Sequence, residues 1–269
     1  ENAILFPAAE DRLGVKGWDH LEFVVGNAKQ AAAYFQSSLG FQPLARRGLE
    51  TGCKDAASYV LSQGEMIVVL TSPLESEGEL SSHLKQHGDG VRVIAIQVND
   101  ATMAHKTAVD SGAVSFLEPI VESDGDGKVV RSAIRVYGDT LHVFIERSSY
   151  SGVFLPGYQP WTPAFKPSAV GIKYVDHVVA NVGWGEMNDW TRFYKQVFGM
   201  DQLVSFDDKD ISTDFTALRS VVMTEASGRI KFPINEPAEG RKKSQIEEYL
   251  DFNKGPGVQH IAMATDDIL

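Results

Sequence analysis

The sequence predicts an α+β protein of two domains, built from tandem βαβββ units. Two internal matches lead to this prediction. Residues 18–25 resemble residues 175–180, so that His20 matches His177 at an offset of 157 residues. Residues 87–96 resemble residues 254–263, so that Val93 matches His260 at an offset of 167 residues. Self-similarity at a nearly constant spacing indicates a repeated structural unit, and loops readily absorb the difference of about ten residues.

The first half of the chain contains enough apolar segments for two units. Gly64 precedes the apolar run 66–70, which is typical of a hairpin turn between two strands. The Asp- and Gly-rich segment 123–128 also predicts a hairpin turn, because an EF-hand calcium loop needs a glutamate at its twelfth position and flanking helices. We expect helices at 28–39, 77–87 and 100–112, and strands at 18–25, 41–48, 56–62, 65–71, 91–98, 114–121, 128–137 and 140–147.

The second half repeats this order and stops within a unit. We expect strands at 171–180, 201–207, 214–224, 229–235 and 257–264, and helices at 187–198 and 242–252. An N-terminal domain of two units should cover residues 1–150, and a C-terminal domain of about one and a half units residues 171–269. Residues 151–170 should form a semi-rigid linker with its aromatic side chains packed on a domain surface, because four prolines disfavour a helix or a central strand there.

Composition and charge narrow the classes of partner. The chain has 25 Lys+Arg against 36 Asp+Glu and a net charge of −11, which argues against a nucleic-acid partner because phosphate binding depends on basic side chains. No apolar run reaches the roughly 20 residues of a membrane helix, so no membrane partner is expected. Cys53 is the only cysteine, which excludes an internal disulfide and favours the cytoplasm.

The repeat separates two of the seven histidines from the others. His177 and His260 occupy the first strands of consecutive units, within apolar segments. A single strand histidine is more often a satisfied core residue than a ligand, but two at repeat-equivalent positions favour a divalent metal site. We expect His83, His87 and His105 on polar helix faces and His142 in an outer strand.

Several segments of the second half resemble the 4-hydroxyphenylpyruvate dioxygenase family of the vicinal oxygen chelate superfamily. The resemblance is carried by residues 152–158, 175–177, 217–222, 231–237, 243–246 and 257–262. It implies the vicinal oxygen chelate (glyoxalase/bleomycin-resistance/dioxygenase) fold, with a scaffold domain at 1–150 and a catalytic domain at 171–269. It also implies an Fe(II) enzyme that converts 4-hydroxyphenylpyruvate and O2 to homogentisate and CO2 in tyrosine breakdown, and a homodimer or homotetramer.

The same resemblance assigns site residues. His177 and His260 match the family's two histidine ligands of iron, and the third ligand, a glutamate, is expected beyond Leu269. The residues that match the family's substrate pocket are Ser220, Asn235, Gln245 and Gln259. Strict strand alternation points Gln259 away from the face of His260 unless the strand bulges there.

Other activities stay open at this point. 4-Hydroxymandelate synthase uses the same iron, substrate and fold, although Pro233 and Asn235 resemble the dioxygenase pattern more closely. The same fold also serves metal-dependent isomerases, ring-cleaving enzymes and non-catalytic modules that bind small molecules. A binding module would not need two histidines at matched positions, so iron content distinguishes it from the oxygenases.

Overall fold

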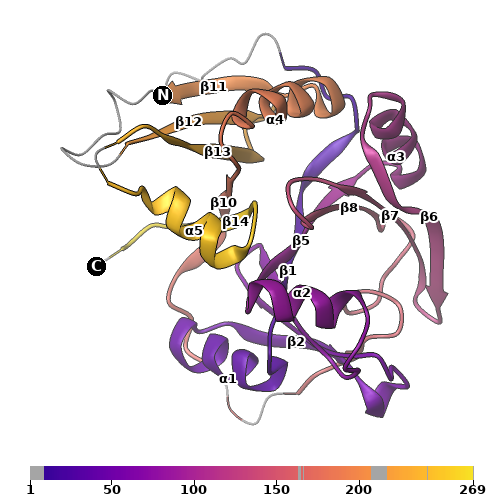
Figure 1. The fold of residues 1–269 in the computed structure, drawn as a ribbon. Helices are drawn as coiled ribbons and strands as arrows, with labels where there is room; N and C mark the ends of the chain where they lie inside the picture. The colour runs from indigo at the N-terminus through magenta and orange to yellow at the C-terminus, as the bar shows by residue number, and fades with distance from the viewer. Residues whose placement is uncertain (1–8, 163–164, 166, 207–216, 241, 269) are drawn as a thin grey trace.

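Two β-sheets with helices packed against them form the molecule (Figure 1). The computed structural model describes residues 9–162, 165, 167–206, 217–240 and 242–268. Within these ranges a nine-stranded sheet has the order β6-β7-β8-β5-β1-β4-β3-β2-β9, and a five-stranded sheet has the order β11-β12-β13-β10-β14. Positions 207 and 214–216 of the predicted strands lie outside the described residues.

The first half of the chain contains two βαβββ units, as predicted. The elements are β1 (Val15–Val24), α1 (Ala28–Leu39), β2 (Gln42–Arg47), the 3-10 helix η1 (Leu49–Thr51), β3 (Ala56–Gln63), β4 (Met66–Pro73), α2 (Glu79–His87), β5 (Gly90–Val98), α3 (Ala101–Asp110), β6 (Val114–Asp124), β7 (Gly127–Arg135) and β8 (Leu141–Glu146). Helix α1 begins and ends at the predicted residues because both ends are capped: the Asn27 side chain accepts from the Gln30 backbone N–H, and Gly40 adopts φ 70°.

The second half repeats the order. Its elements are β10 (Ile172–Asn181), α4 (Met187–Phe193), the π-helical turn η2 (Tyr194–Phe198), β11 (Asp201–Phe206), β12 (Ala217–Thr224), β13 (Lys231–Ala238), α5 (Gln245–Asn253) and β14 (Gly257–Thr265). Helix α5 starts at a capping box in which Ser244 and Glu247 each bind the other's backbone N–H. The prediction of an α+β fold from repeated units is confirmed.

Strand register shows how closely the two halves correspond. In the first sheet β1 pairs parallel to β4 and antiparallel to β5, with Glu22 opposite Val93. In the second sheet β10 pairs parallel to β13 and antiparallel to β14, with Val179 opposite His260. The offsets of 157 and 167 residues therefore hold to the single residue across both strand pairs.

The linker covers the first sheet. Phe154 and Leu155 are buried in an apolar cluster with side chains of β5, β7 and β8, and Trp161 packs on Tyr59 with 4.9 Å between ring centroids. The linker also adds the short edge strand β9 (Gln159–Pro160) to β2, which the sequence did not predict. Phe165 is 52% exposed, so it does not pack as expected.

The predicted exposure of four histidines is wrong. His83, His87 and His105 are 4–7% exposed, and His142 is fully buried. Helix α2 contacts α5 of the second half, and β8 lies inside the sheet between β7 and β5, so neighbours remote in sequence cover His83, His87 and His142. The His105 ring instead contacts Ser115 at the start of β6, at 2.9 Å. The His142 Nε2 atom lies 2.8 Å from the Tyr194 hydroxyl in a core cluster that extends through both halves.

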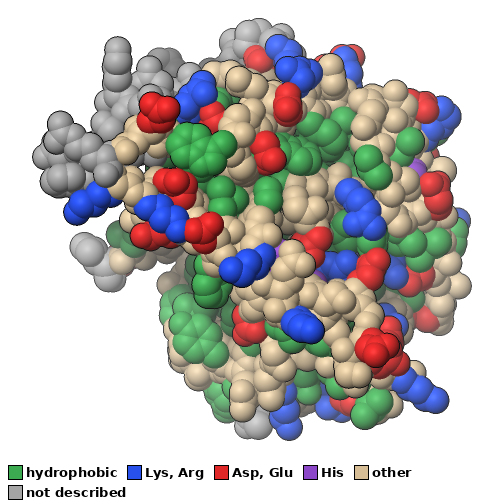
Figure 2. Space-filling view, viewed as in Figure 1, with side chains coloured by type: hydrophobic (Ala, Val, Ile, Leu, Met, Phe, Trp, Pro, Cys, Tyr) green, Lys and Arg blue, Asp and Glu red, His purple; other side chains and the backbone are tan. Residues whose placement is uncertain are grey.

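The surface carries charges of both signs. Figure 2 shows Lys and Arg side chains interspersed with Asp and Glu over the visible face. Within the described ranges, every helix is too short or too polar to cross a bilayer.

Candidate metal centre

The predicted histidine ligands lie side by side on neighbouring strands. His177 is on β10 and His260 on β14, which pair antiparallel, and their ring centroids are 5.9 Å apart. The His177 side chain is 29% exposed, and His260 is more open. The structure thus brings together two histidines that are 83 positions apart in the chain.

A β-bulge next to each histidine supplies a hydrogen-bond partner for its ring. Asp176 is an extra residue on β10 between the pairs Val175–Met263 and His177–Ala262, and Gln259 is an extra residue on β14 beside His260. A bulge turns two consecutive side chains toward one face of the sheet. Asp176 Oδ2 lies 2.7 Å from His177 Nδ1, and Gln259 Oε1 lies 2.8 Å from His260 Nδ1.

These contacts fix which ring nitrogen is free. A carboxylate oxygen and an amide oxygen can only accept, so Nδ1 of each neutral ring carries the proton and Nε2 keeps its lone pair. Such partners orient most metal-binding histidines in proteins. Partial burial and the charge of His177 lower the pKa of His260, which favours the neutral, ligating form.

Lys231 forms an ion pair with Asp176, the residue that contacts the His177 ring. Its Nζ lies 2.5 Å from Asp176 Oδ1. Burial raises the pKa of Asp176, but its bonds to Lys231 and His177 outweigh that effect and the pKa lies below its usual value. Asp176 is therefore a carboxylate that accepts from both neighbours.

The ring separation fits a shared ion. Metal–nitrogen bonds of about 2.1 Å place each ring centroid roughly 3.3 Å from the ion, so two rings on one ion lie at most about 6.5 Å apart. The observed 5.9 Å is within this limit. Two oriented imidazoles suit a borderline divalent ion such as Fe(II), with a carboxylate as the usual third ligand.

A row of polar side chains crosses the same face of the sheet. Ser220 on β12 pairs with Asn235 on β13, and Asn235 pairs with Asn181 on β10. Asn181 is four residues after His177 on the same strand, so the two side chains point to the same face of the sheet. Ser220, Asn235 and Asn181 are all buried, and the Asn235 amide lies 3.3 Å from Asn181 Oδ1. The opposite face carries core residues such as Ile234.

The other two predicted pocket residues lie elsewhere. Gln259 is on the histidine face because of its bulge, and its amide oxygen is engaged by His260. Gln245 is the exposed first residue of α5. Sequence reasoning missed Asp176, Asn181 and Lys231, although the repeated Asp-His pair at 19–20 and 176–177 was a signal for Asp176.

The first domain keeps part of this arrangement. Asp19 is the equivalent bulge residue and lies 2.6 Å from His20 Nδ1. Val93 replaces the second histidine, and the Phe154 ring of the linker packs on His20 at 5.1 Å. An apolar side chain thus occupies the place where an ion would need ligands.

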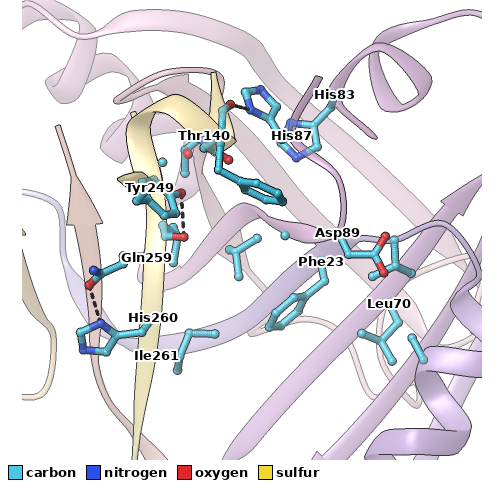
Figure 3. Close-up of a pocket in the computed structure, with 18 of the residues that line it drawn as sticks. Phe23, Leu70, His83, His87, Asp89, Thr140, Tyr249, Gln259, His260 and Ile261 are labelled. Carbon is cyan, nitrogen blue, oxygen red and sulfur yellow. Dashed lines mark hydrogen bonds between the residues drawn. The ribbon is translucent and has the colours of Figure 1, made fainter. Parts of the chain in front are cut away.

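A cavity lies next to the histidine pair (Figure 3). It has a volume of about 630 Å³ and lies between α1, α2, α5 and β14. His260 and Gln259 are drawn on one side of β14, and Phe23, Leu70 and Ile261 on the other (Figure 3). His260 and Gln259 line this largely apolar cavity, whereas His177 does not.

Comparison with known families agrees with the fold. Residues 174–269 match the glyoxalase/bleomycin resistance protein/dioxygenase superfamily, and residues 9–154 match the N-terminal model of hydroxyphenylpyruvate dioxygenase. The repeated βαβββ units and the histidine pair on adjacent first strands thus define a protein of this superfamily.

Relatives narrow the assignment. The chain is 43% identical over 264 residues to 4-hydroxyphenylpyruvate dioxygenase of Yarrowia lipolytica, covering 94% of this chain and 67% of that protein. It is 43% identical to the Dictyostelium discoideum enzyme, covering 95% of this chain and 71% of that protein. The chain belongs to the hydroxyphenylpyruvate dioxygenase family.

Solved structures support the same fold. A triple-substituted 4-hydroxymandelate synthase from Streptomyces coelicolor matches with a TM-score of 0.83 and 27% identity, over 95% of this chain and 72% of that one. A fusion of a xylose isomerase-like TIM barrel with 4-hydroxyphenylpyruvate dioxygenase matches with a TM-score of 0.67 and 22% identity, over 98% of this chain and 38% of that one.

Proposed function

We propose that this protein is an Fe(II)-dependent dioxygenase that converts 4-hydroxyphenylpyruvate and O2 to homogentisate and CO2, with His177 and His260 as iron ligands. The observation that carries the proposal is the pair of bulges that aims Asp176 and Gln259 at the two rings. Each ring then presents Nε2 on the same face of the sheet. Identity of 43% to dioxygenases of this name supports the substrate.

The chain's own side chains provide orientation and polarity around the ion. Bound iron would hold the 2-oxo acid of the substrate and activate O2. Asp176, held by Lys231, would fix the His177 ring, and Gln259 would fix the His260 ring while leaving its amide N–H groups for the substrate. Ser220 and Asn235 would contribute hydrogen bonds to the substrate within an otherwise apolar pocket. Gln245, the first residue of α5, would contribute another polar group to this pocket.

Iron binding tests the ligands directly. We expect His177→Ala and His260→Ala to lose Fe(II) in anaerobic equilibrium dialysis. The matched control is His20→Ala, which removes the repeat-equivalent histidine of the first domain and should keep iron. Unchanged iron content in both strand variants, or equal loss in the control, would reject the ligand assignment.

Product analysis tests the reaction. The full-length protein with Fe(II), 4-hydroxyphenylpyruvate and ascorbate should consume O2 and release homogentisate, and an iron-loaded protein that consumes no O2 would reject the proposal. The structural match to 4-hydroxymandelate synthase makes that activity the second candidate. Chromatography separates the two, because the synthase product carries the new hydroxyl on the benzylic carbon.

A further inference from the structure

A second group of potential metal ligands lies between the domains, apart from the His177–His260 pair. His83 and His87 are one helical turn apart on α2, and Asp139 lies in the turn between β7 and β8. Each offers one ligand atom, and these atoms lie within 4.8 Å of one another. The two ring centroids are 4.6 Å apart, inside the limit of about 6.5 Å for rings that share an ion.

The hydrogen bonds of His87 leave one ring nitrogen without a partner. Its Nδ1 contacts the backbone carbonyl of Asn253 at the end of α5. A carbonyl only accepts, so Nδ1 carries the proton and the Nε2 lone pair is free in the neutral ring. That Nε2 is buried and lies 3.2 Å from Asp139 Oδ2, another acceptor. Two acceptors facing each other in a buried site call for a cation between them.

His83 faces the same carboxylate oxygen with its other ring nitrogen. Its Nδ1 lies 2.7 Å from Asp139 Oδ2, so an ion that replaces the Nδ1 proton would have His83 Nδ1, His87 Nε2 and this oxygen as ligands; His83 Nε2 is buried without a hydrogen-bond partner. Both imidazole side chains are at least nine-tenths buried, at 4% and 5% exposure, whereas the Asp139 side chain is 37% exposed. A backbone carbonyl that accepts from the other ring N–H, as Asn253 does for His87, is a usual outer contact of a metal-binding histidine.

We infer that His83, His87 and Asp139 form a binding site for a divalent cation of the zinc class. Two imidazoles and one carboxylate are a frequent ligand set for Zn(II), which accepts nitrogen and oxygen ligands in tetrahedral geometry. All three residues line the 630 Å³ cavity, which gives an entry path and room for a water molecule as fourth ligand. Figure 3 shows His83 and His87 at the edge of this cavity, across from His260.

The site would join the two domains. Asp139 and α2 belong to the first domain, whereas the Asn253 carbonyl that holds His87 belongs to the second. A bound ion fixes the His87 ring, and through it the end of α5 just before β14. Binding should therefore raise the thermal stability of the whole chain, since an ion that binds only the folded state stabilises it by mass action.

The test measures zinc binding in a protein without the candidate iron ligands. In the background of His177→Ala with His260→Ala, we expect about one Zn(II) per chain after dialysis, measured by atomic emission, and a Zn(II)-dependent rise in melting temperature. Adding Asp139→Asn should weaken Zn(II) binding at least about tenfold in competition with a chelating indicator. The control is His105→Gln, which alters another buried histidine of the same domain, bound to Ser115, and should leave zinc affinity unchanged.

The possible outcomes distinguish a metal ion bound between His87 and Asp139 from a proton held there. If Asp139→Asn fails to fold, as judged by its melt in EDTA, His83→Asn replaces it and should show the same loss of zinc. Absence of Zn(II) binding in the double-alanine background, or equal binding in the Asp139→Asn and His105→Gln proteins, overturns the proposal. The cluster would then be an ion pair in which His87 is protonated. These results do not depend on whether the His177–His260 pair binds iron.

Discussion

Acid sensitivity of the interdomain core offers a quantitative test of the packing. His142 is fully buried, with its ring among those of Tyr194, Phe198 and Phe232. Burial lowers the pKa of His142 to about 3 from a usual value near 6.5. The folded state therefore keeps a neutral ring under conditions in which the unfolded chain binds a proton.

The sign and size of the effect follow from this difference. Because the folded pKa is depressed, the stability is fully present above about pH 6.5 and is lost as pH falls toward the folded pKa. One pKa unit corresponds to about 1.4 kcal/mol, so lowering the pH from about 7.5 to about 5 should cost about 2 kcal/mol through His142 alone. Replacing His142 with Phe removes this cost but also loses the 2.8 Å hydrogen bond to the Tyr194 hydroxyl, which is worth about 1 kcal/mol.

The effect of His142→Phe on the free energy of unfolding should therefore change sign with pH. We expect His142→Phe to be less stable than the parent by about 1 kcal/mol near pH 7.5 and more stable by about 1 kcal/mol near pH 5. Urea unfolding of both proteins at the two pH values measures this, and the remaining histidines are common to both and cancel in the difference. An equal loss of stability in parent and variant between the two pH values would refute the assignment of a neutral, buried His142.

Three further predictions concern the other contacts. Asp176→Asn should weaken Fe(II) binding at least about tenfold in anaerobic titration, because the ring it orients loses a charged partner; unchanged affinity would contradict that role. Gly138→Ala should lower the free energy of unfolding by about 3 kcal/mol, because φ is 62° and the new Cβ would lie 2.3 Å from a backbone oxygen. Gly157→Ala, with φ 83° and open space around the new Cβ, should lower it by only about 1 kcal/mol. Equal denaturant midpoints for the two variants would contradict this difference. Arg147→Met should cost about 3 kcal/mol at neutral pH by leaving the buried Asp19 carboxylate without its cation, and less in acid, where the carboxyl is protonated. Urea unfolding of Arg147→Met and the parent protein at neutral and at acid pH tests this last prediction.

The order of helices and strands, which is the same in the two halves, could be predicted from the sequence. Period-two alternation, glycine turns and two offset matches depend on local patterns, and the structure reproduces them, including the bounds of α1. Ser220 and Asn235 came from the family resemblance, and strand pairing in the structure puts them on the face of His177. The side on which Gln259 lies could not be predicted, because a bulge adds one residue to one strand and leaves no periodic pattern in the sequence.

The sequence by itself determined the repeated fold and the two histidines on the neighbouring strands β10 and β14. Tertiary structure alone decided which other histidines are buried, that His142 joins the two halves, and that His83, His87 and Asp139 meet. The physical reason is that a helix face polar in its own sequence can still be covered by a distant element, as α5 covers α2. Burial and hydrogen-bond partners depend on such long-range packing, whereas strands and turns follow from neighbours along the chain.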